Sequence, residues 1–290
     1  MRVLITGVSG FIGYNLMQHF RNKYTLFTPL HQQLDILDSE SLKKYVRENK
    51  IQIIIHCANT NDVAYNLTPY DVLNNGLRMF YSVEKCAFYC DRIIYFGSGA
   101  EYDRSNYIPK MKEEYFDQNI PQDPYGFAKY TESKLVHNHD NIYDLRLFGV
   151  YGKKEQWQRR FISNNIVRSL KGLPMTLSQN AMFDYLYVED LCRIVEWFIE
   201  HEPKHKHYNV CTGQPIALQE LAHMINEVSG LHREIQIAKD GWQSEYSGDN
   251  SRLLAEIGGF QFTDKKKSIE EMWNYYAEHI DEFDERQLLL

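Results

Sequence analysis

Short apolar runs alternate with longer segments of mixed polarity along the first half of the chain. The runs at 3–5 and 51–56 are apolar at consecutive positions, which is typical of strands buried on both faces of a parallel sheet. The predicted strands cover residues 3–5, 24–27, 51–56, 92–96 and 142–147, and the predicted helices cover 11–20, 39–49, 74–90 and 125–137. This alternation predicts an α/β fold with a Rossmann-type, doubly wound parallel sheet.

The pattern loosens after Gly152 into helical and irregular segments, although 184–200 and 207–213 indicate a helix and a strand that return to the sheet. In such folds ligands bind at the carboxyl ends of the strands. The expected domains are a Rossmann domain of residues 1–152 plus about 184–212, and a smaller substrate-binding domain of residues 153–183 plus 213–290.

Composition narrows the class of partner. The net charge of −7 and the pI near 5.9 argue against nucleic acid and anionic membrane surfaces as partners. Apolar runs are too short to span a bilayer, and the N-terminus enters a strand pattern directly, so we expect a cytoplasmic protein. The five cysteines lack zinc spacing, and we expect no metal site.

A glycine-rich loop joins the first predicted strand to the first predicted helix. The segment TGVSGFIG places Gly7, Gly10 and Gly13 there, ahead of the helix that Phe11 and Ile12 open. Such glycines allow a tight turn, close approach of a pyrophosphate and close packing of helix on strand, while the helix N-terminus favours the phosphate charge. This context predicts a dinucleotide-binding loop.

The residues after the second predicted strand bear on the choice of cofactor. Thr28 to His31 include no carboxylate that would repel a 2′-phosphate, and His31 is able to donate to one. The cofactor is therefore NADPH or NADH, with NADPH slightly favoured. Asp35 lies where a ribose-binding acid is usually sought, but it follows the strand too late, and we assign it to the adenine amino group.

A serine and a tyrosine–lysine pair carry the predicted chemistry. Ser98 ends the strand of YFGSGAEYD, and PYGFAK places Tyr125 and Lys129 one helical turn apart. An ammonium group near a phenol stabilises the phenolate, so that the phenol can exchange a proton with a carbonyl or alcohol. Ser98 is expected to hold the same oxygen by a hydrogen bond, while a nicotinamide exchanges hydride at the adjacent carbon.

The tyrosine–lysine spacing alone is not specific, because it recurs at Tyr81 with Lys85 and at Tyr130 with Lys134. Position distinguishes the pairs. The Tyr81 helix precedes the Ser98 strand, and Tyr130 points away from Tyr125 on the same helix. Only Tyr125 opens its helix shortly after the strand that bears Ser98.

Together these motifs, with LDILDS, IIIHCA, LFGVYG, FDYLYVEDL and YNVCTGQPIALQELA, resemble the extended short-chain dehydrogenase/reductases that act on nucleotide sugars. The pattern is most similar to the GDP-fucose synthase group of epimerase/reductases. The resemblance implies a nucleotide-diphosphate sugar substrate, a homodimer, and Ser98, Tyr125 and Lys129 as catalytic residues. Combined with the residues above, it implies a cofactor site of Gly7, Gly10, Phe11, Ile12, Gly13, His31, Asp35, Ile36, Ala58, Asn74, Tyr125 and Lys129.

Departures from the family pattern narrow the reaction. Sugar 4,6-dehydratases carry Thr-Asp-Glu where this chain has Ser98-Gly99-Ala100, and Glu101 is one position late and expected to face elsewhere. The proton-shuttling cysteine of the GDP-fucose synthase group corresponds to Ala100 and its histidine falls near Arg160, so the double epimerisation is expected to be absent. Phe183 replaces the usual phosphate-binding arginine, for which Arg159, Arg160, Arg168 and Arg252 are alternatives. The expected substrate-binding residues are Ser98, Gly99, Ala100, Arg160 and Arg252.

The sequence therefore predicts an NAD(P)H-dependent reductase of a 4-keto nucleotide sugar. A nucleotide-sugar 4-epimerase with tightly bound NAD is the alternative, because the same three residues serve both reactions. A non-catalytic, dinucleotide-binding regulator is the alternative from another class. Such a protein has no physical need for Ser98, Tyr125 and Lys129 together.

Overall fold

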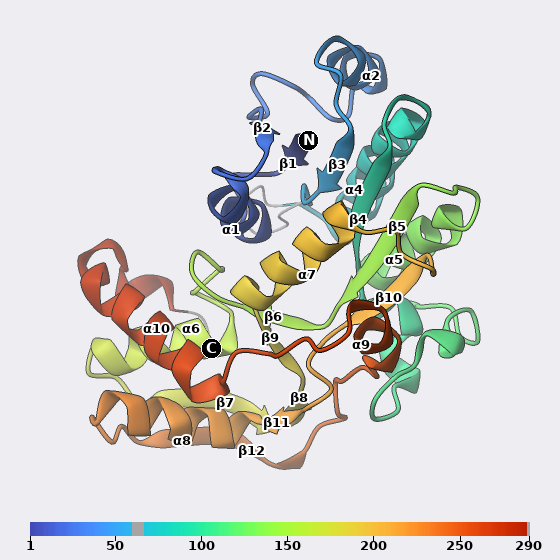
Figure 1. The fold of residues 1–290 in the computed structure, drawn as a ribbon. Helices are drawn as coiled ribbons and strands as arrows, with labels where there is room; N and C mark the ends of the chain where they lie inside the picture. Colours follow the sequence, from blue (N-terminus) through green and yellow to red (C-terminus); the bar gives the residue numbers. More distant parts are fainter. Residues whose placement is uncertain (60–66, 289–290) are drawn as a thin grey trace.

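The computed structural model describes residues 1–59 and 67–288 and contains a central sheet of six parallel strands in these residues (Figure 1). The strand order β2-β1-β3-β4-β5-β10 confirms the predicted doubly wound sheet. The strands are β1 Arg2–Thr6, β2 Thr25–Phe27, β3 Ile53–His56, β4 Arg92–Ser98, β5 Ile142–Leu147 and β10 His207–Val210. The residues of β3, β4, β5 and β10 are almost all buried, as expected for strands that helices cover on both faces.

Helices cover both faces of this sheet. One face carries α1 Phe11–Phe20, α7 Val188–Glu200 and α9 Ser251–Ile257, and the other carries α2 Ser39–Glu48, α4 Pro69–Glu84 and α5 Pro124–Val136. Leu16 and Phe198 pack into the first core, and Val46, Phe80 and Val136 into the second. The short 3-10 turns are Lys85–Tyr89, Gly99–Tyr102, Arg104–Asn106, Glu113–Tyr115, Ile280–Glu282 and Glu285–Gln287.

The helix starts depend on local capping. Asp38 caps α2 by accepting hydrogen bonds from the amides of Glu40 and Ser41, at the start that the sequence predicts. Helix α4 begins five residues before the predicted start, because Thr68 and Asp71 form a capping box around a proline at the first helical position. The helix ends at Glu84 rather than running to residue 90, and a 3-10 turn follows.

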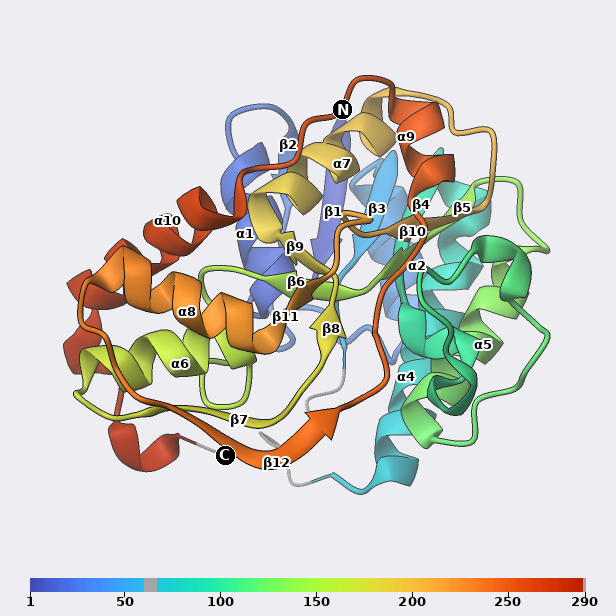
Figure 2. The ribbon, with the colours of Figure 1, turned by 90° about the horizontal axis from the view of Figure 1, so that it is seen from below.

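A second lobe lies beside the carboxyl ends of the strands (Figures 1 and 2). Its core contains Ile166, Ile225 and Met272. Its elements are α6 Phe161–Leu170, α8 Leu218–Ser229, α10 Lys265–Glu278, and β7 Met175–Asn180 paired in parallel with β12 Ile235–Trp242. Short pairs, β6 Gly149–Tyr151 with β9 Tyr185–Tyr187 and β8 Met182–Phe183 with β11 Ile216–Ala217, connect the lobes.

The β7–β12 pair was not predicted, although Met175 and Leu177 alternate with polar residues, and both are buried. Helix α9 falls in the range assigned to the second domain, yet its Leu253 packs against the core on the sheet. The domain boundaries stay a prediction.

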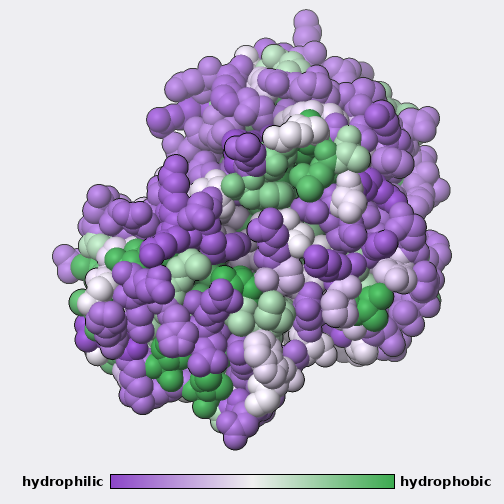
Figure 3. Space-filling model, turned by 60° about the horizontal axis from the view of Figure 1, so that its bottom comes forward, coloured by the Kyte–Doolittle hydropathy of each residue, from purple (hydrophilic) through white to green (hydrophobic). Residues whose placement is uncertain are grey.

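The surface of the protein is mostly polar, in agreement with the negative mean hydropathy of the chain. On the face drawn in Figure 3, polar residues predominate and apolar residues form separate patches. Among the residues that the structure describes, we find no helix with the length and apolar character needed to cross a bilayer.

Candidate functional site

A cavity of about 980 Å³ lies between the sheet and the second lobe. Its wall includes the ends of β3, β4 and β5 on one side, and parts of β7 and β12 on the other. Seven of the residues predicted from the sequence line it: Phe11, Ile12, Ala58, Ser98, Tyr125, Lys129 and Arg160. The fold thus brings residues separated by up to 149 positions to one site, the carboxyl edge expected for a doubly wound sheet.

The glycine loop has the shape that a dinucleotide pyrophosphate requires. Gly7 adopts φ +69°, and a Cβ there would lie 2.6 Å from Ala58 Cα. A Cβ on Gly13 would lie 2.4 Å from the Gly7 carbonyl oxygen, so helix α1 can approach the strand only with glycine at that position. Helix α1 begins after Gly10, and its first turn carries no carboxylate. These residues therefore fit a bound NAD(P) pyrophosphate.

Ser98 is fixed at the end of β4 by the turn that follows it. Its Oγ accepts a hydrogen bond from the Ala100 amide at 3.1 Å, and its own amide donates to Glu101 Oε1 at 2.8 Å. The Tyr246 hydroxyl, from the second lobe, lies beside this turn, since a Cβ on Gly99 would lie 2.8 Å from it. Ser98 is therefore held facing the cavity, while Glu101 is fully buried.

Helix α5 presents the tyrosine and the lysine. Asp123 caps it by accepting from the Gly126 amide at 2.8 Å, which places Tyr125 in the first turn and Lys129 one turn later. The Lys129 ammonium donates to Tyr95 Oη at 2.8 Å and to Glu132 Oε2 at 3.1 Å. Burial alone would lower the pKa of Lys129, but the charge of Glu132 and its hydrogen bond raise the pKa above its ordinary value. Lys129 therefore stays protonated.

Other predicted ligands lie elsewhere in the described chain. His31 and Asp35 are exposed beyond β2, with 3.8 Å between His31 Nε2 and Asp35 Oδ1. Arg252 lies on α9 and pairs with Glu114 at 2.6 Å. Gly99 and Ala100 are buried in the turn behind Ser98, Asn74 is exposed on α4, and Ile36 is half-buried. Their roles as ligands stay predictions.

Several lining residues carry chemistry that sequence reasoning missed. Arg104 and Tyr246 line the cavity near Ser98, and nothing in their local sequence indicates it. Glu155 is the one carboxyl group among the described lining residues, and burial raises its pKa to about 7. Burial and the charge of Lys129 lower the pKa of His56 to about 3, so this imidazole is neutral. Glu132 had a usable signal, because it lies three residues after Lys129 on the same helix.

These features define a class of protein. A Rossmann-type sheet, a glycine loop shaped for pyrophosphate, and a serine, tyrosine and lysine on one cavity are typical of short-chain dehydrogenase/reductases. The chain belongs to the NAD dependent epimerase/dehydratase family, whose pattern matches residues 3–211. It is an NAD(P)-dependent enzyme of the extended type, whose members act on nucleotide sugars, as the motifs predict.

Individual relatives are similar over nearly the whole chain. GDP-L-colitose synthase of Yersinia pseudotuberculosis is 22% identical, over 95% of this chain and 98% of the relative. The solved UDP-glucose 4-epimerase of Thermotoga maritima superposes with a TM-score of 0.82 and 18% identity, over 97% and 100% of the two chains. GDP-mannoheptose C4 reductase of Campylobacter jejuni, solved with NADP bound, gives a TM-score of 0.80 and 19% identity, over 95% and 98%.

Proposed function

We propose that the protein is an NADPH-dependent reductase of a GDP-linked 4-keto sugar, without the epimerisation at C3 and C5. The observation that carries the proposal is that Ser98, Tyr125 and Lys129 line one cavity beside the glycine loop. Position 100 carries alanine, fully buried, so the turn after Ser98 offers the cavity no acid or thiol for a second proton transfer.

Each residue has a separate task in this reaction. The glycine loop would hold a dinucleotide by its pyrophosphate, and the nicotinamide of that cofactor would supply the hydride for the sugar carbon. Ser98 Oγ donates a hydrogen bond to the ketone oxygen and orients it. The Tyr125 hydroxyl gives its proton to that oxygen as the carbonyl becomes an alcohol. The Lys129 ammonium lies one turn from Tyr125 and stabilises the phenolate that remains.

The relatives support the choice of substrate and cofactor. GDP-L-colitose synthase and GDP-mannoheptose C4 reductase carry GDP-sugars in their names, and the reductase was solved with NADP. The absence of a carboxylate at residues 28–31 agrees with NADPH. Homodimer formation and a cytoplasmic location stay predictions.

A 4-epimerase with tightly bound NAD is the second candidate, which the likeness to UDP-glucose 4-epimerase favours. Absorbance of the reduced nicotinamide separates the two reactions. Steady consumption of NADPH with a GDP-4-keto sugar supports the reductase. Conversion of a nucleotide sugar without net consumption supports the epimerase, and no turnover in either assay supports a non-catalytic regulator.

The Tyr125→Phe variant tests the proposed chemistry. Removal of the hydroxyl takes away the proton donor, and we expect kcat/KM to fall by roughly 10²–10⁴-fold. Steady-state NADPH oxidation measures this loss, and circular dichroism checks the fold. Tyr130→Phe is the matched control, because Tyr130 lies on the same helix but bonds to Asp117 and packs on Phe116. Parent-like turnover in Tyr125→Phe would refute both enzyme mechanisms.

A further inference from the structure

Arg104 lies at the end of the cavity where Ser98 is held. The residue opens the 3-10 turn Arg104–Asn106, shortly after Ser98 in the chain, and both residues line the cavity. Arg104 Cζ lies 5.8 Å from the centre of the Tyr246 ring. The Tyr246 hydroxyl lies beside Gly99, since a Cβ there would lie 2.8 Å from it. These contacts place the guanidinium close to the residues proposed to hold the substrate oxygen.

The backbone before Arg104 has an unusual conformation. Asp103 adopts φ +63° and ψ 104°, which is uncommon for a residue with a side chain, and it is 5% exposed. Its carboxylate accepts hydrogen bonds from the Ser105 amide at 3.2 Å and from Asn106 Nδ2 at 2.6 Å. The strained backbone is therefore held in place, and it fixes the point from which Arg104 enters the cavity wall.

The guanidinium of Arg104 has no counter-ion in the part of the chain that the structure describes. Asp123 acts on its charge only from beyond ion-pair distance, and no described residue accepts a hydrogen bond from it. By contrast, Arg92, Arg193 and Arg252 pair with carboxylates at 2.5–2.6 Å. Arg104 is also exposed, so its N–H donors are open to a ligand.

The charge of the cavity wall favours an anionic ligand, although the chain carries a net charge of −7. The cations among the described lining residues are Arg104, Lys129, Arg159 and Arg160. Glu155 is the one carboxyl group among them. Such an excess of cations attracts anions. Arg159 and Arg160 precede α6 in the second lobe, whereas Arg104 follows β4, so we expect Arg104 to meet a different part of the ligand.

We propose that Arg104 binds an anionic oxygen group of the substrate, either a phosphate of the nucleotide or a carboxylate on the sugar, beside the ring that Ser98 and Tyr125 hold. The inference rests on the proposed function, because that function places the sugar ring at Ser98 and Tyr125. A guanidinium suits both groups, since its planar fork donates two parallel hydrogen bonds to phosphate or carboxylate oxygens.

The test is the Arg104→Met variant, which removes the charge but keeps much of the side-chain length. The probes are GDP-mannose and GDP-mannuronate, which differ only in whether C6 of the sugar is an alcohol or a carboxylate. Isothermal titration calorimetry measures their binding, and we expect a loss of affinity of roughly 10–100-fold. Equal losses for the two probes identify the diphosphate as the group bound. A loss confined to GDP-mannuronate identifies the sugar carboxylate.

Three controls accompany this variant. Arg104→Lys keeps the charge without the planar fork and should lose less affinity. Arg47→Met is the matched control, because Arg47 Cζ lies 5.5 Å from the centre of the Tyr89 ring and neither residue lines the cavity. It should bind both probes as the parent does. NADPH binding should be unchanged in Arg104→Met, because the glycine loop belongs to the start of α1. Circular dichroism checks the fold, and Arg104→Gln replaces the methionine variant if that variant does not fold.

Unchanged binding of both probes in Arg104→Met would overturn the inference and leave the proposed function intact. Weaker binding of NADPH in that variant would also overturn it, because Arg104 would then serve the cofactor. Failure of the proposed function has a different signature, since the parent would bind neither probe or Tyr125→Phe would keep parent-like turnover. The inference would then fall with the function.

Discussion

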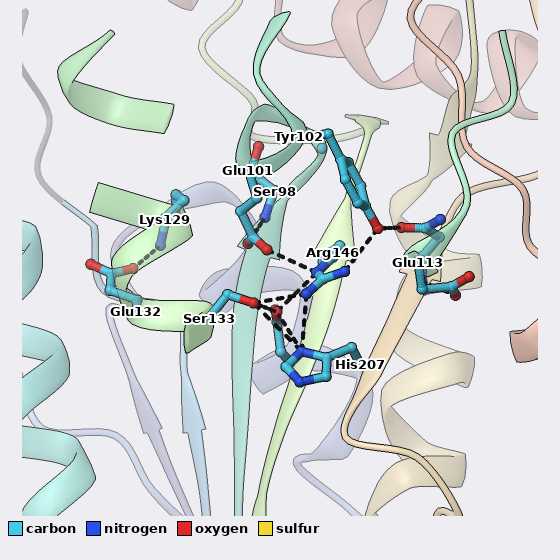
Figure 4. A network of polar contacts seen from close by, with 12 residues as sticks. Ser98, Glu101, Tyr102, Glu113, Lys129, Glu132, Ser133, Arg146 and His207 are labelled. Atoms are coloured by element: carbon cyan, nitrogen blue, oxygen red, sulfur yellow. Dashed lines mark hydrogen bonds and ion pairs between the residues drawn. The ribbon is translucent and has the colours of Figure 1, made fainter. Parts of the chain in front are cut away.

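Two buried ionic groups lie between α5 and the sheet, and they differ in whether they reach the cavity. Glu132 and Ser133 are consecutive on α5 and point in opposite directions, Glu132 toward Lys129 and Ser133 toward Arg146 (Figure 4). The first set, the Lys129 group, consists of Lys129, Glu132 and Tyr95, whose hydroxyl contacts both. We call the second set the Arg146 group. Its members are Arg146 and Asp144 on β5, Glu101 and Tyr102 after β4, Ser133 on α5 and His207 on β10.

The Arg146 group is closed to solvent. The Arg146 guanidinium lies 2.8 Å from Glu101 Oε2 and 3.1 Å from Asp144 Oδ2, and its side chain is 1% exposed. Burial and the charge of Asp144 raise the pKa of Glu101 well above its ordinary value. Gly97 completes the arrangement, because a Cβ there would lie 2.1 Å from Asp144 Oδ1 and 2.2 Å from Glu101 Oε1.

The two groups both pair buried charges, but they serve different purposes. The Lys129 group contributes one ammonium to the cavity wall, so its charge acts on the reacting groups. The Arg146 group meets the site through Glu101, which accepts the Ser98 amide hydrogen bond, and through Asp144, which lies against Gly97 of the cavity wall. We therefore expect variants of the Arg146 group to change stability and the placement of Ser98, and variants of the Lys129 group to change turnover.

The largest effect on stability should come from Arg146→Met. Removing the guanidinium leaves Glu101 and Asp144 adjacent in the interior without a cation, and we expect unfolding to become easier by about 3–5 kcal/mol. Urea denaturation measures the loss.

The control for this prediction is Arg193→Met, since Arg193 is half exposed and pairs with Asp190 at 2.5 Å. Asp190 keeps two hydrogen bonds from Thr263, at 2.9 and 2.6 Å. The control variant should therefore lose less stability than Arg146→Met. Near-parent stability in Arg146→Met would contradict this prediction. It would show that Glu101 and Asp144 share a proton, so that no cation is required to stabilise them.

Much of the framework, and the residues placed at the cavity, were open to prediction from the sequence. Strands β1 and β3 contain continuous apolar runs, and the glycines of TGVSGFIG are required by the local geometry of the loop. Ser98 ends a strand and Tyr125 opens a helix, so their shared edge follows from parallel topology. These are short-range signals combined with one rule of connectivity.

The rest depends on contacts that local patterns do not encode. The sequence of residues 142–147 predicts a strand whether Arg146 is exposed to solvent or paired with Glu101. Arg146 and Glu101 come together only when the sheet packs. The early start of α4 needed recognition of the Thr68–Asp71 capping box. The β7–β12 pair has the alternation of a strand, but β12 is exposed along most of its length, so its apolar signal is weak.

Glu155 is another buried carboxyl group, and it differs from those of the two ionic groups because burial dominates its environment. Ser163 and Arg160 stabilise the carboxylate less than burial destabilises it, and the pKa rises from 4.5 to about 7. The folded state then binds a proton more tightly than the unfolded state. The contribution of Glu155 to the free energy of unfolding therefore falls as the pH rises from about 4.5 to about 7, and it is constant above that range.

Glu155→Gln should remove this pH dependence. At about pH 8 the variant should be more stable than the parent by up to about 3 kcal/mol, because the charge no longer needs to be buried. At about pH 5 the two proteins should nearly coincide, and urea unfolding at both pH values measures the difference. An equal gain at both would attribute it to packing rather than to the buried charge.

The smallest effect should come from His137, at the solvent end of the Arg146 group. His137 is exposed, and its Nδ1 lies 2.8 Å from His207 Nε2. His137→Ala removes one hydrogen bond, while His207 keeps its contacts to Asp144 at 3.2 Å and to Arg146 at 3.1 Å. We expect a loss of about 1 kcal/mol by urea denaturation. A loss as large as that of Arg146→Met would mean that the Arg146 group is stabilised mainly at its exposed edge. Burial would then not explain how the Arg146 group differs from the Lys129 group.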